Sequence, residues 1–199
     1  MTLSEQLHKI DYSSLPISEY NRRYIMRMLP DLDYYLEIYG RCLDMMINRS
    51  HKAPRDLCLV DYGGGHGFLS CAAKQRGIGK VIYIDFNSLS AKTASIIGEH
   101  LGLSADAIIH GDSEKLREWC TEHQVKPDII MGMDVIEHIY RLEDFFADMF
   151  AINPAVKMLF TTGSTPFNPL VKKRLHKIMV ADELGPNGFR EERRHHIQH

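Results

Sequence analysis

The sequence predicts an α/β fold: a Rossmann-like, doubly wound and mostly parallel sheet. Short apolar runs alternate with helix-length segments between residues 57 and 160. These runs are apolar throughout, as in strands that are buried on both faces of a sheet. The chain has 199 residues, of which 44% are hydrophobic and 25% are charged. This length and composition fit one globular domain with an appendage.

Two helices are expected before the sheet. The first covers residues 18–29 and stops at Pro30, because proline breaks a helix. The second covers residues 31–48 and has apolar side chains at helical spacing. Six of the nine tyrosines lie in residues 1–40. They indicate either simple packing of an N-terminal helical cap, residues 1–50, or an aromatic lid over a substrate.

Five strands and four intervening helices are expected after the cap. The strands are 57–61, 80–84, 107–110, 128–131 and 156–160, and the helices are 68–76, 88–101, 113–123 and 140–151. Residues 51–165 are therefore assigned to the Rossmann-like domain. Residues 166–199 are assigned to a helical, basic C-terminal segment.

Charge and cysteine usage exclude several classes of protein. The 24 lysines and arginines nearly balance 26 acidic residues, so a generally basic nucleic-acid surface is not indicated. No apolar run has the length of a membrane span, and the N-terminus has no signal-peptide pattern. The four cysteines form no C-x-x-C pair. We therefore expect a cytoplasmic protein with unpaired thiols and no membrane association.

A glycine-rich turn joins the first strand to the helix that follows it. Gly63, Gly65 and Gly67 permit a tight backbone and the close approach of a ligand, and the helix N-terminus offers N–H groups to an anion. The dinucleotide fingerprint would need a glycine where Phe68 stands, which disfavours a nicotinamide-dependent oxidoreductase. No P-loop pattern is present.

Acidic residues follow the next two strands. Asp85 ends the second strand, where a carboxylate can accept hydrogen bonds from ribose hydroxyls. Asp112, followed by Ser113, ends the third strand, where it can accept from an adenine amino group. Each acid taken alone also fits a helix N-cap, which is common in such loops.

These residues in this order resemble the class I S-adenosylmethionine-dependent methyltransferases over residues 57 to about 165. The resemblance implies S-adenosylmethionine as cofactor, with its aminocarboxypropyl end on the glycine loop and its adenine beside Phe86. His66 is either a plain loop residue or a contact to cofactor or acceptor. The implied cofactor-binding residues are Asp61, Gly63, Gly65, Gly67, Asp85, Phe86, Asp112, Ser113 and Met133.

The exit from the fourth strand, residues 134–140, resembles the ubiquinone-biosynthesis-type O-methyltransferases and the small-RNA 2′-O-methyltransferases. Three interpretations stay open. Glu137 and His138 cap a helix that opens here, or His138 with Glu137 is the catalytic base for an oxygen acceptor. By the resemblance, Asp134, Glu137 and His138 could instead hold a divalent metal with a C-terminal histidine: His195, His196 or His199.

The sequence therefore predicts a methyltransferase whose acceptor is an oxygen of a small molecule. One alternative is an RNA methyltransferase, because residues 172–194 carry seven basic and four acidic side chains. The other is a non-catalytic protein that binds S-adenosylmethionine. The resembled fold usually has seven strands, and five are expected here. Three explanations stay open: the chain is truncated, the sheet is naturally short, or a partner covers its edge. The sequence indicates no oligomeric state.

Overall fold

The computed structural model describes residues 1–163 together with residues 173, 176 and 177. The chain divides into two compact units, Met1–Thr161 and Thr162–His199. Every element discussed below lies in the first unit. Most of the predicted C-terminal segment, including the three candidate histidines, lies outside the described residues.

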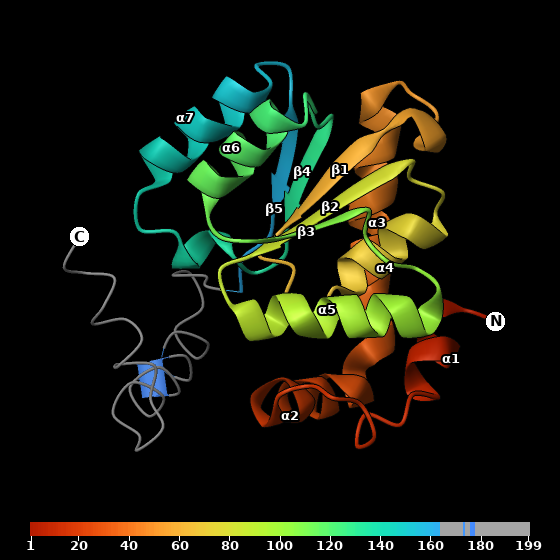
Figure 1. Cartoon of the computed structure of the whole chain (residues 1–199). Helices are drawn as coiled ribbons and strands as arrows, with labels where there is room; N and C mark the ends of the chain where they lie inside the picture. Colours follow the sequence, from red (N-terminus) through yellow and green to blue (C-terminus); the bar gives the residue numbers. More distant parts are fainter. Residues whose placement is uncertain (164–172, 174–175, 178–199) are drawn as a thin grey trace. The chain divides into compact units, whose positions relative to one another are not determined.

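The first unit is built around a five-stranded sheet in the order β3-β2-β1-β4-β5 (Figure 1). All four strand pairings are parallel. This confirms the predicted α/β, doubly wound fold. The strands are β1 (Cys58–Tyr62), β2 (Lys80–Asp85), β3 (Ala107–His110), β4 (Ile129–Gly132) and β5 (Lys157–Phe160).

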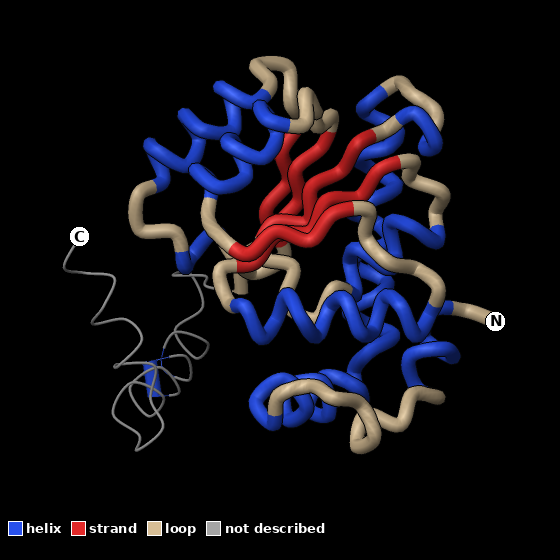
Figure 2. The backbone as a smooth tube through the Cα atoms, viewed as in Figure 1, coloured by secondary structure: helices blue, strands red, loops and turns tan. Residues whose placement is uncertain are grey.

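Helices cover both faces of this sheet, as Figure 2 shows. On one face lie α6 (Ser113–Glu122) and α7 (Leu142–Ile152), and on the other lie α4 (Phe68–Gln75) and α5 (Ser88–Leu101). Successive strand residues point to opposite faces. Leu59 therefore packs in the core beneath α4, while Val60 packs in the core beneath α6 and α7. Both are fully buried, which explains why the strands read as continuous apolar runs.

The N-terminal cap consists of α1 (Leu3–His8), α2 (Glu19–Met28), a 3-10 turn (Leu29–Asp31) and α3 (Leu32–Ser50). Its buried side chains join the core on the α4 side of the sheet. Pro30 ends α2 as predicted, but within a 3-10 turn rather than a break. We did not predict α1, because its six residues are too few to show a period. A capping box between Thr2 and Glu5 starts this short helix.

The segment 134–140 leads from β4 to α7. The helix predicted over residues 140–151 is α7, which spans Leu142–Ile152. The 3-10 turn Ile136–His138 that precedes it was not predicted. The positive φ of Asp134, 53°, turns the backbone away from a helical path right after the strand.

Two further observations concern the helices and the cysteines. None of the helices in the described part of the chain combines the length and the apolarity needed to cross a membrane. Cys42, Cys58, Cys71 and Cys120 are all free thiols.

A buried hydrogen bond joins the cap to the sheet domain, and its loss should weaken the fold. Asn21 of α2 donates from Nδ2 to Thr93 Oγ1 of α5 at 2.8 Å, and both side chains are buried. Asn21→Ala should lower the free energy of unfolding by about 1–3 kcal/mol, because it removes a buried partner. Urea denaturation measures the change. Arg23→Ala, at an exposed position of the same helix, is the control and should change it by less than about 0.5 kcal/mol. Equal effects of the two substitutions would contradict this account.

Candidate functional site

The strand order places a crevice between β1 and β4. After β1 the chain builds the sheet outward through β2 and β3, and it then returns to place β4 on the other side of β1. Loops that leave the carboxyl ends of β1 and β4 therefore run in opposite directions and leave a gap, which is where open α/β sheets bind ligands. The glycine loop, residues 63–67, leaves β1 at this point, and Met133 and Asp134 leave β4.

The glycine loop needs its glycines for different reasons. Gly63, Gly65 and Gly67 all have positive φ, between 54° and 78°. A Cβ on Gly63 would lie 2.4 Å from Cγ2 of Val135, and one on Gly67 would lie 2.8 Å from Cβ of Ala94. A Cβ on Gly65 would meet nothing within 4 Å. Gly63 and Gly67 are therefore required by packing, whereas Gly65 leaves its backbone open to a ligand.

Asp85 fixes this loop to the end of β2. Its Oδ2 accepts from the N–H of Gly65 at 2.9 Å, and its Oδ1 accepts from the N–H of Asn87 at 2.7 Å. The Tyr83 hydroxyl donates to the Gly65 carbonyl at 2.7 Å. Burial raises the pKa of Asp85, and the two backbone hydrogen bonds oppose this effect. Each carboxylate oxygen retains a further lone pair for a ligand.

Asp61 lies beneath the loop and is fully buried. Its Oδ2 accepts from the Ser70 N–H at 3.0 Å and from the Ser70 hydroxyl at 2.7 Å. Asp61 thereby holds the first turn of α4 against β1. Burial raises its pKa to about 7, although both hydrogen bonds from Ser70 lower it.

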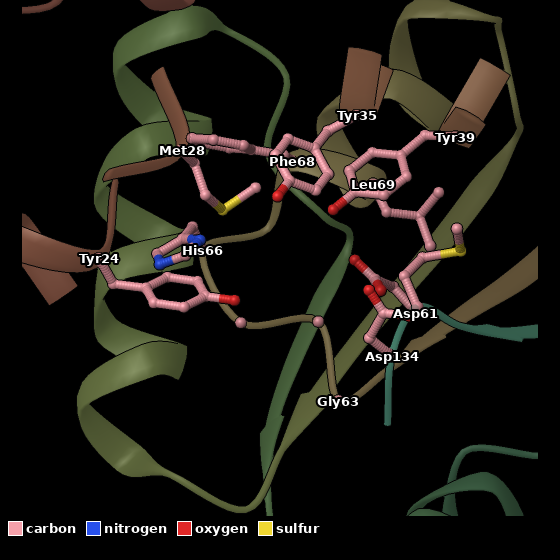
Figure 3. Close-up of a pocket in the computed structure, with 13 residues that line it drawn as sticks. Tyr24, Met28, Tyr35, Tyr39, Asp61, Gly63, His66, Phe68, Leu69 and Asp134 are labelled. Carbon is pink, nitrogen blue, oxygen red and sulfur yellow. The ribbon is translucent and has the colours of Figure 1, made fainter. Parts of the chain in front are cut away.

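A cavity of about 150 Å³ opens between the glycine loop, the end of β4 and the cap. Figure 3 shows the hydroxyls of Tyr24, Tyr35 and Tyr39 and the carboxylates of Asp61 and Asp134 directed into it. None of the three hydroxyls makes a hydrogen bond to another described residue. The side chains that complete the wall are Met28, His66, Phe68, Leu69 and Met133.

His66 is the buried imidazole of this wall. Only 6% of its surface is exposed. Its ring stacks on Tyr24 at a centroid distance of 4.6 Å and lies 5.4 Å from the ring of Phe68. Burial lowers the pKa of His66 to about 4. The side chain is therefore neutral at neutral pH.

The predicted adenine-side residues lie outside this cavity, at the ends of β2 and β3. Phe86 exposes 55% of its surface. Asp112 is the N-cap of α6 and accepts from the Lys115 N–H at 3.1 Å. Ser113 donates its hydroxyl to Asp148 of α7 at 2.7 Å. The N-cap interpretation of Asp112 thus describes its contacts in this structure, and a role toward adenine stays a prediction.

The structure does not bring the predicted catalytic pair into the cavity. Glu137 and His138 are exposed on the 3-10 turn, and neither side chain makes a hydrogen bond or ion pair within residues 1–163. Asp134 does line the cavity, and its N–H donates to Thr161 Oγ1 at 3.0 Å. Among the described residues, no three metal-ligating side chains come together. The fourth metal candidate, His199, lies outside them.

The sequence predicted a helical cap over the acceptor side but not which of its side chains line the site. Tyr24, Tyr35 and Tyr39 come from α2 and α3 and face the glycine loop. The concentration of tyrosines before residue 40 was the available signal, and it was compatible with simple packing of the cap and with an aromatic lid. The structure shows these three at the wall of a cavity.

No protein-family model matches the chain, and no curated protein matches its sequence. Solved structures do resemble it. A protein from Methanococcus maripaludis, described as an S-adenosyl-L-methionine-dependent methyltransferase, covers 86% of this chain and 79% of its own at 16% identity and a TM-score of 0.51. Magnesium protoporphyrin IX methyltransferase from Synechocystis PCC 6803, with bound S-adenosylhomocysteine, covers 72% of this chain at 18% identity and a TM-score of 0.50.

Other neighbours are longer than this chain. A methyltransferase from Agrobacterium tumefaciens covers 67% of this chain but only 47% of its own length, at 19% identity and a TM-score of 0.49. The alignment with the Synechocystis enzyme also spans less than two thirds of that enzyme, 63%. The chain therefore has the fold of the class I S-adenosylmethionine-dependent methyltransferases.

The buried carboxyl of Asp61 should make stability depend on pH. Its folded-state pKa is about 7, above the ordinary aspartate value of 3.8, so between these values the folded state holds the proton more tightly than the unfolded state. Stability from this group therefore falls as pH rises from about 4 to 7. Asp61→Asn removes the titration and should gain stability relative to wild type across this window, by roughly 4 kcal/mol at most.

Urea denaturation at pH 5 and pH 8 measures this difference. The substitution of an exposed carboxylate, Asp56→Asn, serves as the control and should leave the pH dependence unchanged. A parallel pH dependence of wild type and Asp61→Asn would show that Asp61 is ionised without penalty in the folded protein.

Proposed function

We propose that this chain, with its class I methyltransferase fold, transfers a methyl group from S-adenosylmethionine to an oxygen atom of a small molecule. The observation that carries the proposal is the open backbone of Gly65 at the switch point between β1 and β4. Its positive φ and the empty space on its Cα form a cradle that any side chain would fill. The Synechocystis enzyme, which shares the fold, carries S-adenosylhomocysteine.

The residues present fit this cofactor. Tyrosine hydroxyls from the cap suit a carboxylate, and the carboxylates of Asp61 and Asp134 suit an ammonium group. The aminocarboxypropyl end of the cofactor carries both groups. Asp85 keeps lone pairs for ribose hydroxyls at the end of β2, and the exposed ring of Phe86 offers a face for adenine.

When bound, the cofactor would supply a methyl group on a sulfonium, for transfer to the acceptor by in-line displacement with the neutral sulfur as leaving group. The protein's main contribution to such a reaction is to hold the acceptor aligned and close. The cap supplies the wall opposite the glycine loop, so α2 and α3 would position the acceptor. The acceptor must also lose a proton, which our sequence analysis assigns to His138 with Glu137.

A divalent metal is the other means of activating the acceptor that the resemblance implies. Among the described residues, Asp134, Glu137 and His138 do not converge on a common point. We derive no step through a metal.

The lining of the cavity favours a small-molecule acceptor over RNA. Its described lining contains two carboxyl groups and neither lysine nor arginine, so a phosphate group would find no counter-charge among these residues. Methylation of RNA and binding without catalysis remain the alternatives. The free cysteines fit the proposed cytoplasmic location.

Filling the cradle at Gly65 should weaken cofactor binding without unfolding the protein. Gly77 is the matched control, because it also has positive φ, 78°, and also has nothing within 4 Å of an added Cβ. Gly77 lies just before the start of β2, whereas Asp85 and the glycine loop lie at the carboxyl end of this strand. Gly65→Ala and Gly77→Ala should each cost about 1 kcal/mol of stability through backbone strain. Only Gly65→Ala should lower the affinity for S-adenosylhomocysteine, by at least about ten-fold, or 1.4 kcal/mol.

Isothermal titration calorimetry on both variants and on the wild type measures these affinities. Equal affinities in the two variants would mean that no ligand approaches Gly65, and the proposed cofactor site would be wrong.

A further inference from the structure

One face of α2 is turned away from the core and carries aromatic rings next to positive charges. Four residues follow each other at intervals of three and four positions, which places them on one face of the helix. These residues, which we call the α2 stripe, are Tyr20, Arg23, Tyr24 and Arg27. All four are exposed. The helix contributes other side chains, such as Ile25, to the core.

The α2 stripe adjoins the cavity through Tyr24. The ring of Tyr24 stacks on His66 at a centroid distance of 4.6 Å, and its hydroxyl points into the cavity (Figure 3). Burial raises the pKa of the Tyr24 hydroxyl, as does the nearby Asp134, whereas the positive charge of Arg27 lowers it. Arg27 therefore lies close to the mouth of the cavity. A molecule that lies on the stripe reaches this mouth without entering the cavity.

The two arginines of the stripe have little counter-charge. Nε of Arg23 lies 3.9 Å from a carboxylate oxygen of Glu19, which also lies 3.5 Å from Nε of Arg22. Arg27 makes no ion pair or hydrogen bond to another described residue. Guanidinium groups bind carboxylates and phosphates through paired N–H donors. The stripe therefore offers two cations to an anionic group and two rings to a flat body.

The cavity beside the stripe has the opposite electrostatic character. Its described lining contains two carboxyl groups, Asp61 and Asp134, and neither lysine nor arginine. An anionic group is therefore disfavoured in the cavity and favoured on the stripe. This contrast would orient a bound molecule, with its anion on α2 and its uncharged end at the mouth of the cavity.

We propose that the α2 stripe binds an anionic group of the methyl acceptor, a carboxylate or a phosphate, while the acceptor oxygen lies at the mouth of the cavity. This inference rests on the proposed function and specifies its acceptor as a small molecule with a negatively charged end. The cavity itself is left to the charged end of the cofactor. Arg23 and Arg27 would then align the acceptor through contacts remote from the reacting atoms.

The test measures binding of benzoate, phenyl phosphate and benzamide to the full-length protein saturated with S-adenosylhomocysteine. Benzamide has nearly the shape of benzoate but no charge, so this pair isolates the effect of charge. At low salt, at least one of the two anions should bind about five-fold more tightly than benzamide, the upper range for exposed ion pairs. The anion that binds more tightly identifies the group as a carboxylate or a phosphate. Salt at about 0.5 M should reduce the preference, because it screens exposed charges.

Two variants with the same change of net charge locate the effect. Arg27→Gln removes a guanidinium of the stripe and should abolish most of the preference for the anion. Arg41→Gln removes a guanidinium of α3 that pairs with Glu37 and should keep the preference. Both arginines are exposed, so neither substitution should unfold the protein.

Equal binding of the anions and benzamide to the wild type would overturn the inference. An equal loss of the preference in both variants would also overturn it, because the effect would then belong to net charge. A preference that is present only without S-adenosylhomocysteine would place the anion in the cavity and contradict the proposal. Binding of a single-stranded oligonucleotide through Arg27, with no preference for the small anions, would assign the stripe to RNA instead.

Calorimetry with S-adenosylhomocysteine on the same samples separates this inference from the proposed function. If this ligand binds while the anions show no preference over benzamide, the acceptor class is wrong and the proposed function stands. If this ligand does not bind, the proposed function fails, and the acceptor role of the stripe fails with it, whatever the anions do.

Discussion

The site depends on one hydrogen bond, from the N–H of Gly65 to the carboxylate of Asp85. It ties the loop after β1 to the end of the neighbouring strand β2, and the Tyr83 hydroxyl strengthens the tie by binding the Gly65 carbonyl. A loop of glycines would otherwise sample many conformations, at a high entropic cost of ordering. With the loop fixed, the cavity wall, the first turn of α4 and the facing cap helices have a defined surface to pack on.

The parallel sheet imposes the other constraint. Because strand order reverses beside β1, the crevice at the ends of β1 and β4 exists before any side chain is placed there. The side chains of Asp61 and His66 are buried at this crevice, and burying a polar group costs free energy. Asp61 accepts hydrogen bonds from Ser70, and no described residue pairs with it as a counter-charge. The ring of His66 makes no hydrogen bond to another described residue. Ionisable groups whose pKa values are shifted by burial in a cleft are candidates for a functional site.

The sheet could be predicted because its strands are buried on both faces, so that continuous apolar runs mark them in the sequence. Patterns in the local sequence did not predict the features that depend on contacts between distant parts of the chain. The six residues of α1 show no periodicity, and the positive φ of Asp134 redirects the chain before α7. The cavity joins residues 24–39 to residues 61–69 and 133–134. Which tyrosines face the loop depends on how the cap docks, and no local pattern encodes this.

Thermal unfolding with S-adenosylhomocysteine and, separately, with NAD tests the central claim most directly. A ligand at 100 times its dissociation constant stabilises the folded state by about 2.7 kcal/mol. For a chain of this size the midpoint should rise by roughly 5–10 °C. We predict this rise with S-adenosylhomocysteine and none with NAD. A rise with NAD alone, or no rise with S-adenosylhomocysteine at millimolar concentration, would contradict the account.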